Sequence, residues 1–276
     1  MKGQEQKTAD LGNGKVGRLL FRLAVPAITA QLVNMLYNIV DRMYIGHIPE
    51  IGAAALTGVG VTFPILMIIS AFSSLIGMGG APRASIKMGQ KEVEGAEKIL
   101  GNCFVTLIGI SIILTVIFLI LGEDLLLLFG ASENTISYGT QYLTIYVSGT
   151  IFVQMALGLN TFISAQGFAK TSMMTVIIGA ISNIILDPIF IFVLDMGVRG
   201  AALATIISQA ISSAWVVRFL SGPKTLLRIR RENFAWRPSV MLPVLALGVS
   251  PFIMQSTESL VNICLNSTLQ RYGGDM

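Results

Sequence analysis

Hydrophobic residues occur in long blocks along this chain and do not alternate with polar stripes. The stretch 108–121 is apolar at almost every position, whereas a helix of a soluble bundle shows a polar face. A helix needs about 20 mostly apolar residues to cross the hydrocarbon core of a bilayer. Seven blocks reach that length. They are 19–45, 53–78, 99–121, 138–160, 172–194, 200–220 and 244–270.

This pattern predicts an all-α protein, a polytopic membrane helix bundle. The short loops predict that the first six helices pack together as an N-lobe over residues 19–222, after a tail at 1–18. A linker at 223–243 leads to a seventh helix within 244–276. Pro26 and Pro251 begin the first and seventh helices alike, which indicates the start of a second repeat. We therefore expect a fragment of a longer protein whose second lobe is missing.

The composition supports a membrane protein. Hydrophobic residues make up 53% of the 276 residues and charged residues 12%, with a mean hydropathy of +0.74. A soluble domain carries about 25% charged residues. One histidine and two cysteines in apolar segments exclude a disulfide framework or a cluster of soft metal ligands. We expect no cofactor beyond a coupling ion.

Positive charges are distributed unevenly between the two sides of the predicted bundle. Most of the Lys and Arg residues fall in the tail and in the loops that follow the second, fourth and sixth helices. Cytoplasmic loops carry this excess, so we expect a multi-pass cell-membrane protein with a cytoplasmic N-terminus. The basic run at 218–237 is then a topology signal that contacts anionic lipid headgroups, and we expect no nucleic-acid partner.

Acidic residues inside the spans are the candidates for chemistry, since a charge at the bilayer centre costs about 3 kcal/mol or more. Asp187 lies about 22 Å into its helix, in the outer half of the membrane. Asn183 precedes it by four residues and shares its helix face. Asp41 and Thr205 also fall in the outer half. These four residues can converge on one outward-facing site for Na⁺, or for a proton carried by a carboxylate.

Structural explanations for the same residues remain open. Asp41 can pair with Arg42 at a helix end, and Asp187 can cap a helix broken by Pro188, which lacks an amide hydrogen. Glu258 lies in a polar run that can form a cavity wall. A further polar series on the first helix can line a lumen or simply pack: Gln31, Asn34 and Tyr37.

Three stretches together carry a resemblance to a known family. They are L-A-V-P-A-I with V-D-R-M-Y-I-G-H in the first helix, S-N-I-I-L-D-P-I-F-I-F in the fifth and V-R-G-A-A-L-A-T-I-I-S-Q in the sixth. In these stretches the chain resembles the MATE family of multidrug and toxic compound extrusion transporters, and it is most similar to the bacterial DinF-like branch.

The resemblance implies twelve helices in two lobes, working as a monomer when complete. It implies efflux of organic cations and other amphipathic compounds in exchange for Na⁺ or H⁺. The implied cation site comprises Asp41, Asn183, Asp187 and Thr205 with the backbone of Ala201. The implied conformational switch is Pro26, to which we add Pro188 from its position beside the carboxylate. The central drug cleft would require the second lobe.

Two other functions fit this sequence less well. A lipid-linked oligosaccharide flippase of the same superfamily would favour Lys or Arg along its cavity, and the spans carry these residues only near their edges. An intramembrane protease would need an H-E-x-x-H motif, a serine–histidine pair or a G-x-G-D context, and the sequence has none of them. We therefore expect a transporter and not an enzyme.

Overall fold

The computed structural model describes residues 16–273 and contains only helices and their connections in that range. This confirms the all-α membrane fold. The predicted tail lies outside the described residues up to position 15, as do residues 274–276. The elements are α1 (Val16–Gly46), α2 (Gly52–Gly89), α3 (Val93–Leu128), α4 (Ile136–Ser148), α5 (Thr150–Ala165), α6 (Ala169–Pro188), the π-helical turn η1 (Ile189–Val193), α7 (Gly197–Leu220), the 3₁₀ turn η2 (Arg231–Asn233) and α8 (Pro238–Gly273).

The fourth predicted span, 138–160, is a broken one. Helices α4 and α5 meet at Gly149 with a bend of 59°. Six other helices of the described chain are long and apolar enough to cross a membrane, and the bent pair, taken as one span, is the seventh. Gly149 lies against Ile206 of α7, where a Cβ atom would collide with its side chain. The Thr115 hydroxyl donates to the Val147 carbonyl (2.8 Å), so a backbone group near the break is satisfied from α3.

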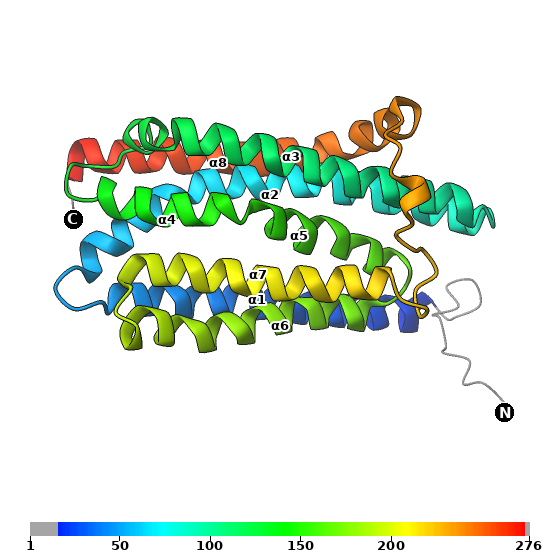
Figure 1. Cartoon of the computed structure of the whole chain (residues 1–276), viewed down its shortest axis with the longest axis horizontal. Helices are drawn as coiled ribbons and strands as arrows, with labels where there is room; N and C mark the ends of the chain where they lie inside the picture. The colour runs from blue at the N-terminus through cyan, green and yellow to red at the C-terminus, as the bar shows by residue number, and fades with distance from the viewer. Residues whose placement is uncertain (1–15, 274–276) are drawn as a thin grey trace.

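The helices form two groups joined by the bent pair (Figure 1). Helix α2 packs against α3 and α8 on one side, α6 packs against α1 and α7 on the other, and α5 contacts both α2 and α7. Small residues permit the close packing, because lipid provides no hydrophobic drive between helices. A Cβ atom at Gly77 would lie 2.6 Å from the Gly158 carbonyl oxygen of α5, and one at Gly79 would collide with the Val244 carbonyl of α8.

The buried apolar side chains form two separate cores, one above the other along the helix axes. One core surrounds Ile65 of α2 and α4, and the other surrounds Phe162 of α5 and the first half of α3. Polar groups lie at the level between them. The Gln154 amide accepts from the Ser73 hydroxyl (2.8 Å) and donates to the Ile69 carbonyl (3.0 Å), and both side chains are buried.

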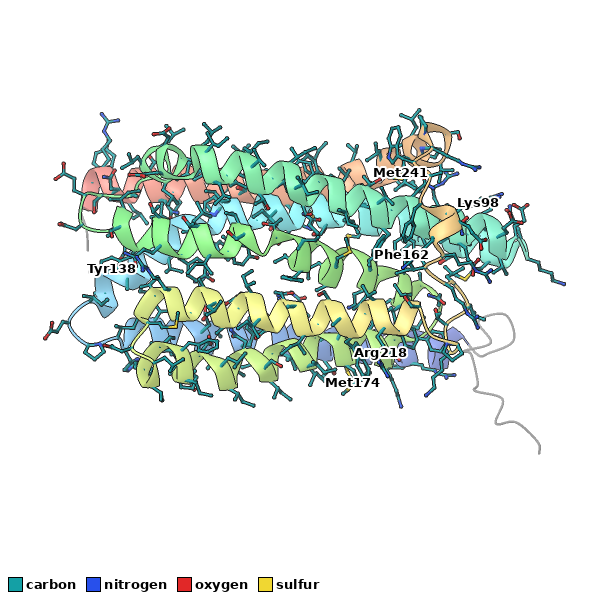
Figure 2. The ribbon with its side chains drawn as sticks, viewed as in Figure 1. Lys98, Tyr138, Phe162, Met174, Arg218 and Met241 are labelled. Carbon is teal, nitrogen blue, oxygen red and sulfur yellow. The ribbon has the colours of Figure 1, made fainter. Side chains whose placement is uncertain are left out.

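The two ends of the bundle differ in charge. We call the end with the α2–α3 turn, the α5–α6 turn and the segment after α7 the basic end, and the other the distal end. Figure 2 shows Lys98 and Arg218 toward the basic end, away from Tyr138 at the distal end. Side chains such as Ile120 of α3 and Leu260 of α8 are exposed, as expected of surfaces that face lipid.

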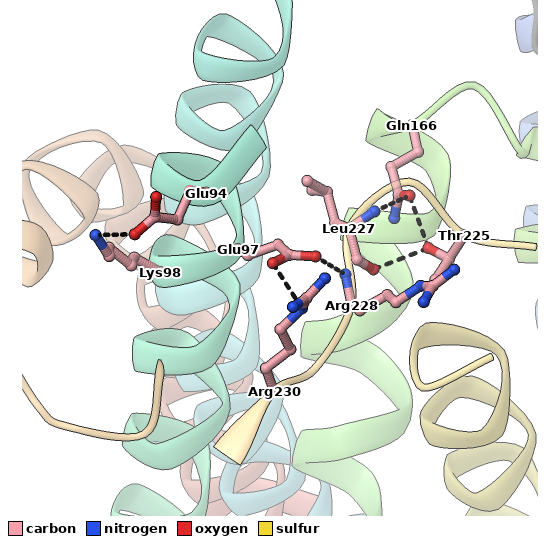
Figure 3. A network of polar contacts seen from close by, with 8 residues as sticks. All are labelled: Glu94, Glu97, Lys98, Gln166, Thr225, Leu227, Arg228 and Arg230. Carbon is pink, nitrogen blue, oxygen red and sulfur yellow. Dashed lines mark hydrogen bonds and ion pairs between the residues drawn. The ribbon is translucent and has the colours of Figure 1, made fainter. Parts of the chain in front are cut away.

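The segment between α7 and α8, residues 221–237, is fastened to the basic end by buried polar side chains (Figure 3). Gln166 Oε1 accepts from the Thr225 hydroxyl (2.7 Å) and from the amides of Leu226 (2.8 Å) and Leu227 (2.9 Å). Glu97 accepts from the Arg228 amide (3.2 Å) and pairs with the Arg230 guanidinium (2.9 Å). The segment is thus an ordered strap, and α8 begins at Pro238, before the predicted start at 244.

Candidate cation site

Two polar side chains of α6 lie one turn apart near its distal end. The Asn183 amide nitrogen donates to Asp187 Oδ1 at 3.1 Å, and the two side chains are 2% and 0% exposed. The outward side of the same helix carries Ile181 and Ile185, which are more than half exposed. Helix α6 therefore turns its polar face inward and its apolar face outward, as expected of a membrane helix that lines a polar interior.

Asp41 joins these two residues from α1. Helix α1 packs along α6, and the Asp41 and Asp187 carboxyl groups lie within hydrogen-bonding reach of each other. Arg42 turns away from the site, and its guanidinium lies over the Phe63 ring, 5.1 Å from the ring centroid. The residues that the sequence placed in the outer half of the membrane therefore meet across the α1–α6 interface.

Three acceptor oxygens at this junction are buried and make no hydrogen bond. They are Asp41 Oδ1, Asn183 Oδ1 and Asp187 Oδ2. A buried acceptor without a partner costs about 1–3 kcal/mol, and a charged one costs more. Adjacent ionised carboxylates also repel each other. A small cation or a proton bound among these oxygens would relieve both costs, and hard oxygen donors of this kind favour hard cations.

Thr205 and Ala201 lie on α7, one turn apart. The Thr205 hydroxyl donates to the Ala201 carbonyl (3.0 Å) and lies near the side chain of Tyr142, which is 3% exposed. Tyr142 of α4 is also close enough to Asp41 to interact with its charge. The two predicted α7 groups therefore bond to each other in this structure.

Pro188 ends α6 immediately after Asp187, and the chain continues as the π-helical turn Ile189–Val193. Proline has no amide hydrogen for the carbonyl four residues earlier. Wide π-helical turns are frequent at functional sites, and backbone freed inside a membrane is tolerated where it faces a cavity. The proline thus loosens the backbone directly beside the buried carboxylate.

A cavity of about 50 Å³ lies directly below the carboxylates, toward the basic end. Asn183 and Thr205 form part of its lining, together with the predicted lumen residues Asn34 and Tyr37 of α1. Gln31 is exposed and is not among its lining residues. The cavity extends the polar site toward the middle of the membrane.

The other predicted residues lie away from the carboxylates. Pro26 is buried near the opposite end of α1, about 22 Å from Asp41 along the helix, and borders a second cavity of about 550 Å³. Helix α1 continues through it unbroken. Glu258 is exposed on α8, which packs on the far side of α2. Neither residue contributes to the cation site in this structure.

Sequence reasoning missed several polar residues of this interior. Asn160, Thr175, Ser208 and Ser212 line the cavity, and Tyr142 lies near Thr205. A partial signal exists for Ser208 and Ser212 alone, because polar residues recur at three- or four-residue spacing on α7, but that spacing does not show that this face lines a cavity. No group of three or more His, Cys, Asp or Glu side chains suited to a metal occurs between residues 16 and 273.

Comparison with known proteins agrees with this architecture. The family model MatE matches residues 26–189. The multidrug export protein MepA of Staphylococcus haemolyticus is 27% identical over 256 residues, covering 93% of this chain and 56% of that protein. The solved MATE multidrug transporter DinF-BH is 36% identical, with a TM-score of 0.91 over 99% of this chain and 60% of its own.

A solved outward-facing multidrug resistance MATE family transporter is 25% identical, with a TM-score of 0.85 over 95% of this chain and 58% of its own. The chain therefore spans little more than half the length of the relatives it matches. The family model covers more than half of this chain, and the candidate cation site lies on helices that superimpose on solved transporters. The chain belongs to the MatE family of membrane transporters.

Proposed function

We propose that this chain works in multidrug efflux, as the cation-binding part of an antiporter that exports organic cations and other amphipathic compounds in exchange for Na⁺ or H⁺. The observation that carries the proposal is the set of three buried, unpartnered oxygens on Asp41, Asn183 and Asp187. A ligand that enters and leaves explains why these oxygens lack hydrogen-bond partners here. Oxygens with a permanent structural role would be paired with a donor in the protein itself. The similarity to proteins described as multidrug exporters or multidrug transporters supports drug as the exported substrate.

The coupling step follows from charge neutralisation. A bound cation or proton removes the repulsion between Asp41 of α1 and Asp187 of α6, so it favours the packing in which these helices lie together. A ligand shifts a conformational equilibrium only through its different affinity for the two states. Helix α1 carries Asp41 at one end and Pro26 at the other, and we infer that it transmits the change along the bundle.

We further propose that the basic end faces the cytoplasm, as the positive-inside rule requires. Asp187 then lies near the outer side, where an external cation reaches it first. An inside-negative potential adds about 2.3 kcal/mol per elementary charge per 100 mV to inward movement across the whole membrane. This direction of cation flow opposes the outward movement of drug, as antiport demands.

The chemistry of the cavities argues against the flippase alternative. Among the residues that the structure describes, no Lys or Arg lines either cavity. A phosphate-bearing lipid headgroup needs cationic partners, because burial of an unpaired phosphate charge is costly. The lining of both cavities is neutral instead, and the carboxylates beside the smaller cavity suit cations.

The test uses everted membrane vesicles that contain the protein expressed from its complete reading frame. Asp41→Asn and Asp187→Asn keep the size of each side chain and remove its charge, while Asp124→Asn, an exposed residue near the distal end of α3, is the matched control. We expect both site variants to lose ion-driven ethidium transport and the control to retain it. Wild-type transport by both site variants would refute the assignment.

The same vesicles separate the two coupling ions. A Na⁺ gradient without a pH difference and a pH difference without Na⁺ are imposed in turn. Transport driven by only one of them identifies the ion, and transport driven by neither refutes antiport.

A further inference from the structure

The buried face of α6 is mostly polar. Its buried positions are Ser172 and Thr175 near the basic end, Ala180 in the middle, and Asn183 and Asp187 near the distal end. This spacing places them on one side of the helix. A helix that only anchored the bundle would bury apolar residues there, and the outward face of α6 is apolar at Ile181 and Ile185.

Helix α7 presents a matching polar series. Thr205, Ser208 and Ser212 share one face of the helix, and Ser208 and Ser212 are 3% and 4% exposed. The Ser212 hydroxyl donates to the Thr175 carbonyl of α6 at 3.2 Å. Gly179 lies opposite Ser212, and a Cβ atom there would lie 2.5 Å from the serine hydroxyl oxygen. The two polar series therefore face each other at close range.

The cavity below the carboxylates runs between these two series. Its volume of about 50 Å³ can hold roughly three to five waters, since each needs about 10–15 Å³ of such space. Two buried acceptors border it without a hydrogen-bond partner, Asn183 Oδ1 near the carboxylates and Asn160 Oδ1 of α5 toward the basic end. We call this cavity the chamber. Its lining offers what a hydrated cation needs, and it includes no carboxylate that would hold the cation in place.

A narrow polar contact separates the chamber from the larger cavity at the basic end. The Asn160 amide donates to the Ser172 carbonyl (3.2 Å), and the Ser164 hydroxyl donates to the Ser172 hydroxyl (2.7 Å). Asn160 and Thr175 line the chamber, while Ser164 and Ser172 line the cavity of about 550 Å³. One helical turn, from Ser172 to Thr175, therefore separates the two spaces.

We propose that the chamber is the exit route of the coupling cation, which passes from the carboxylates to the basic end inside this bundle, and that Asn160, Ser164 and Ser172 form its gate. The inference rests on the proposed coupling of transport to Na⁺ or H⁺. The cation moves from Asp187 past Asn183 into the hydrated chamber and crosses the gate when these hydrogen bonds open. It thereby leaves without crossing a central drug cleft.

Cysteine accessibility tests the route directly. In a cysteine-free background, Ser212→Cys and Ile211→Cys place a thiol at neighbouring positions of α7, the first toward the chamber and the second on the exposed outer surface, where Ile211 is 41% exposed. Everted vesicles are treated with Ag⁺, a thiol-reactive cation small enough for a chamber of about 50 Å³. We expect Ser212→Cys to react about a hundredfold faster than Ile211→Cys, because the charged reagent does not enter hydrocarbon. Equal rates would overturn the proposal.

Transport supplies the second test. Asn160→Leu keeps the approximate size of the side chain but removes the polar lining and one gate bond. We expect ion-driven ethidium transport to fall at least about tenfold, while Na⁺ or H⁺ still raises the melting temperature as in the wild type, because the carboxylates are intact. Wild-type transport by Asn160→Leu would refute the gate.

The outcomes separate this inference from the function on which it rests. If Asp41→Asn and Asp187→Asn transport normally, the antiport assignment fails. If they are inactive while Ser212→Cys reacts as slowly as Ile211→Cys, the function stands and the exit route fails.

Discussion

Replacing Gln166 with leucine removes the group that fastens the strap to the bundle. Its side-chain oxygen accepts three hydrogen bonds from residues 225–227. Leucine has a similar size and no acceptor. The Leu227 amide would then be buried without its partner, since Leu227 is 0% exposed, whereas the Thr225 hydroxyl would still donate to the Leu227 carbonyl (2.9 Å).

The expected cost follows from these groups. A buried donor left without its acceptor costs about 1–3 kcal/mol. Leu226 is half exposed, so its amide can bond to water when the partner is lost. One buried amide left without its acceptor therefore predicts a loss of about 1–3 kcal/mol in the stability of the closed strap. That loss raises the open population by roughly 5- to 150-fold at about 1.4 kcal/mol per factor of ten.

Limited proteolysis measures the opening. The strap contains trypsin sites at Lys224, Arg228, Arg230 and Arg231, and cleavage tracks the open population when reclosing is fast. Everted vesicles expose the basic end if it is cytoplasmic. We expect trypsin to cut Gln166→Leu much faster than the wild type at these sites.

Two controls give the result its meaning. Gln90→Leu makes the same change at an exposed position of the basic end and should leave cleavage unchanged. Gln166→Glu retains an acceptor oxygen and should remain largely protected. If Gln166→Leu is cut as slowly as the wild type, the strap is held instead by Glu97, by packing and by Asn102, whose side-chain oxygen accepts from the Arg237 amide (2.7 Å). Cleavage only in right-side-out vesicles would contradict the cytoplasmic orientation.

Two further predictions concern the packing of the bundle. Gly79→Leu should lower the melting temperature sharply in detergent, because its side chain would collide with the α8 backbone and overpacking costs about 1–3 kcal/mol or more. Gly60→Leu should leave the melting temperature unchanged, because Gly60 has open space around it. Equal melting temperatures for the two variants would contradict the close α2–α8 contact. Gln154→Leu should lower the free energy of unfolding by about 1–3 kcal/mol in denaturation measurements, because it leaves buried groups of α2 unpaired. Gln31→Leu, at an exposed position, should leave the free energy of unfolding unchanged. An unchanged stability of Gln154→Leu would show that the polar layer is not structural.

Much of the fold was predictable because hydrocarbon imposes a length and an apolar composition on every spanning helix. All seven predicted blocks correspond to spans, and the i, i+4 spacing of Asn183 and Asp187 matches their hydrogen bond. The break at Gly149 was not predictable. It depends on Ile206, more than fifty residues away, occupying the space that a side chain at Gly149 would need.

The polar interior was only partly visible in the sequence. Carboxylates in a span are conspicuous because they are costly there, so Asp41 and Asp187 stood out. Serine and threonine are not conspicuous, because their hydroxyls can bond within their own helix, as Ser208 does to the Ala204 carbonyl (2.7 Å). Only the facing of α6 and α7 shows that Ser208 and Ser212 belong to one cavity. The strap was likewise unpredictable, since Gln166 and Thr225 are brought together by the fold.

The break between α4 and α5 at Gly149 also has a consequence for how the molecule unfolds. The two apolar cores lie on either side of it, separated by the Ser73–Gln154 layer, so the bundle resembles two half-height proteins stacked in one membrane. Cooperative units of local unfolding follow such boundaries. Amide hydrogen exchange should therefore divide into two classes, with the half that holds the carboxylates opening while the half beneath the strap stays protected.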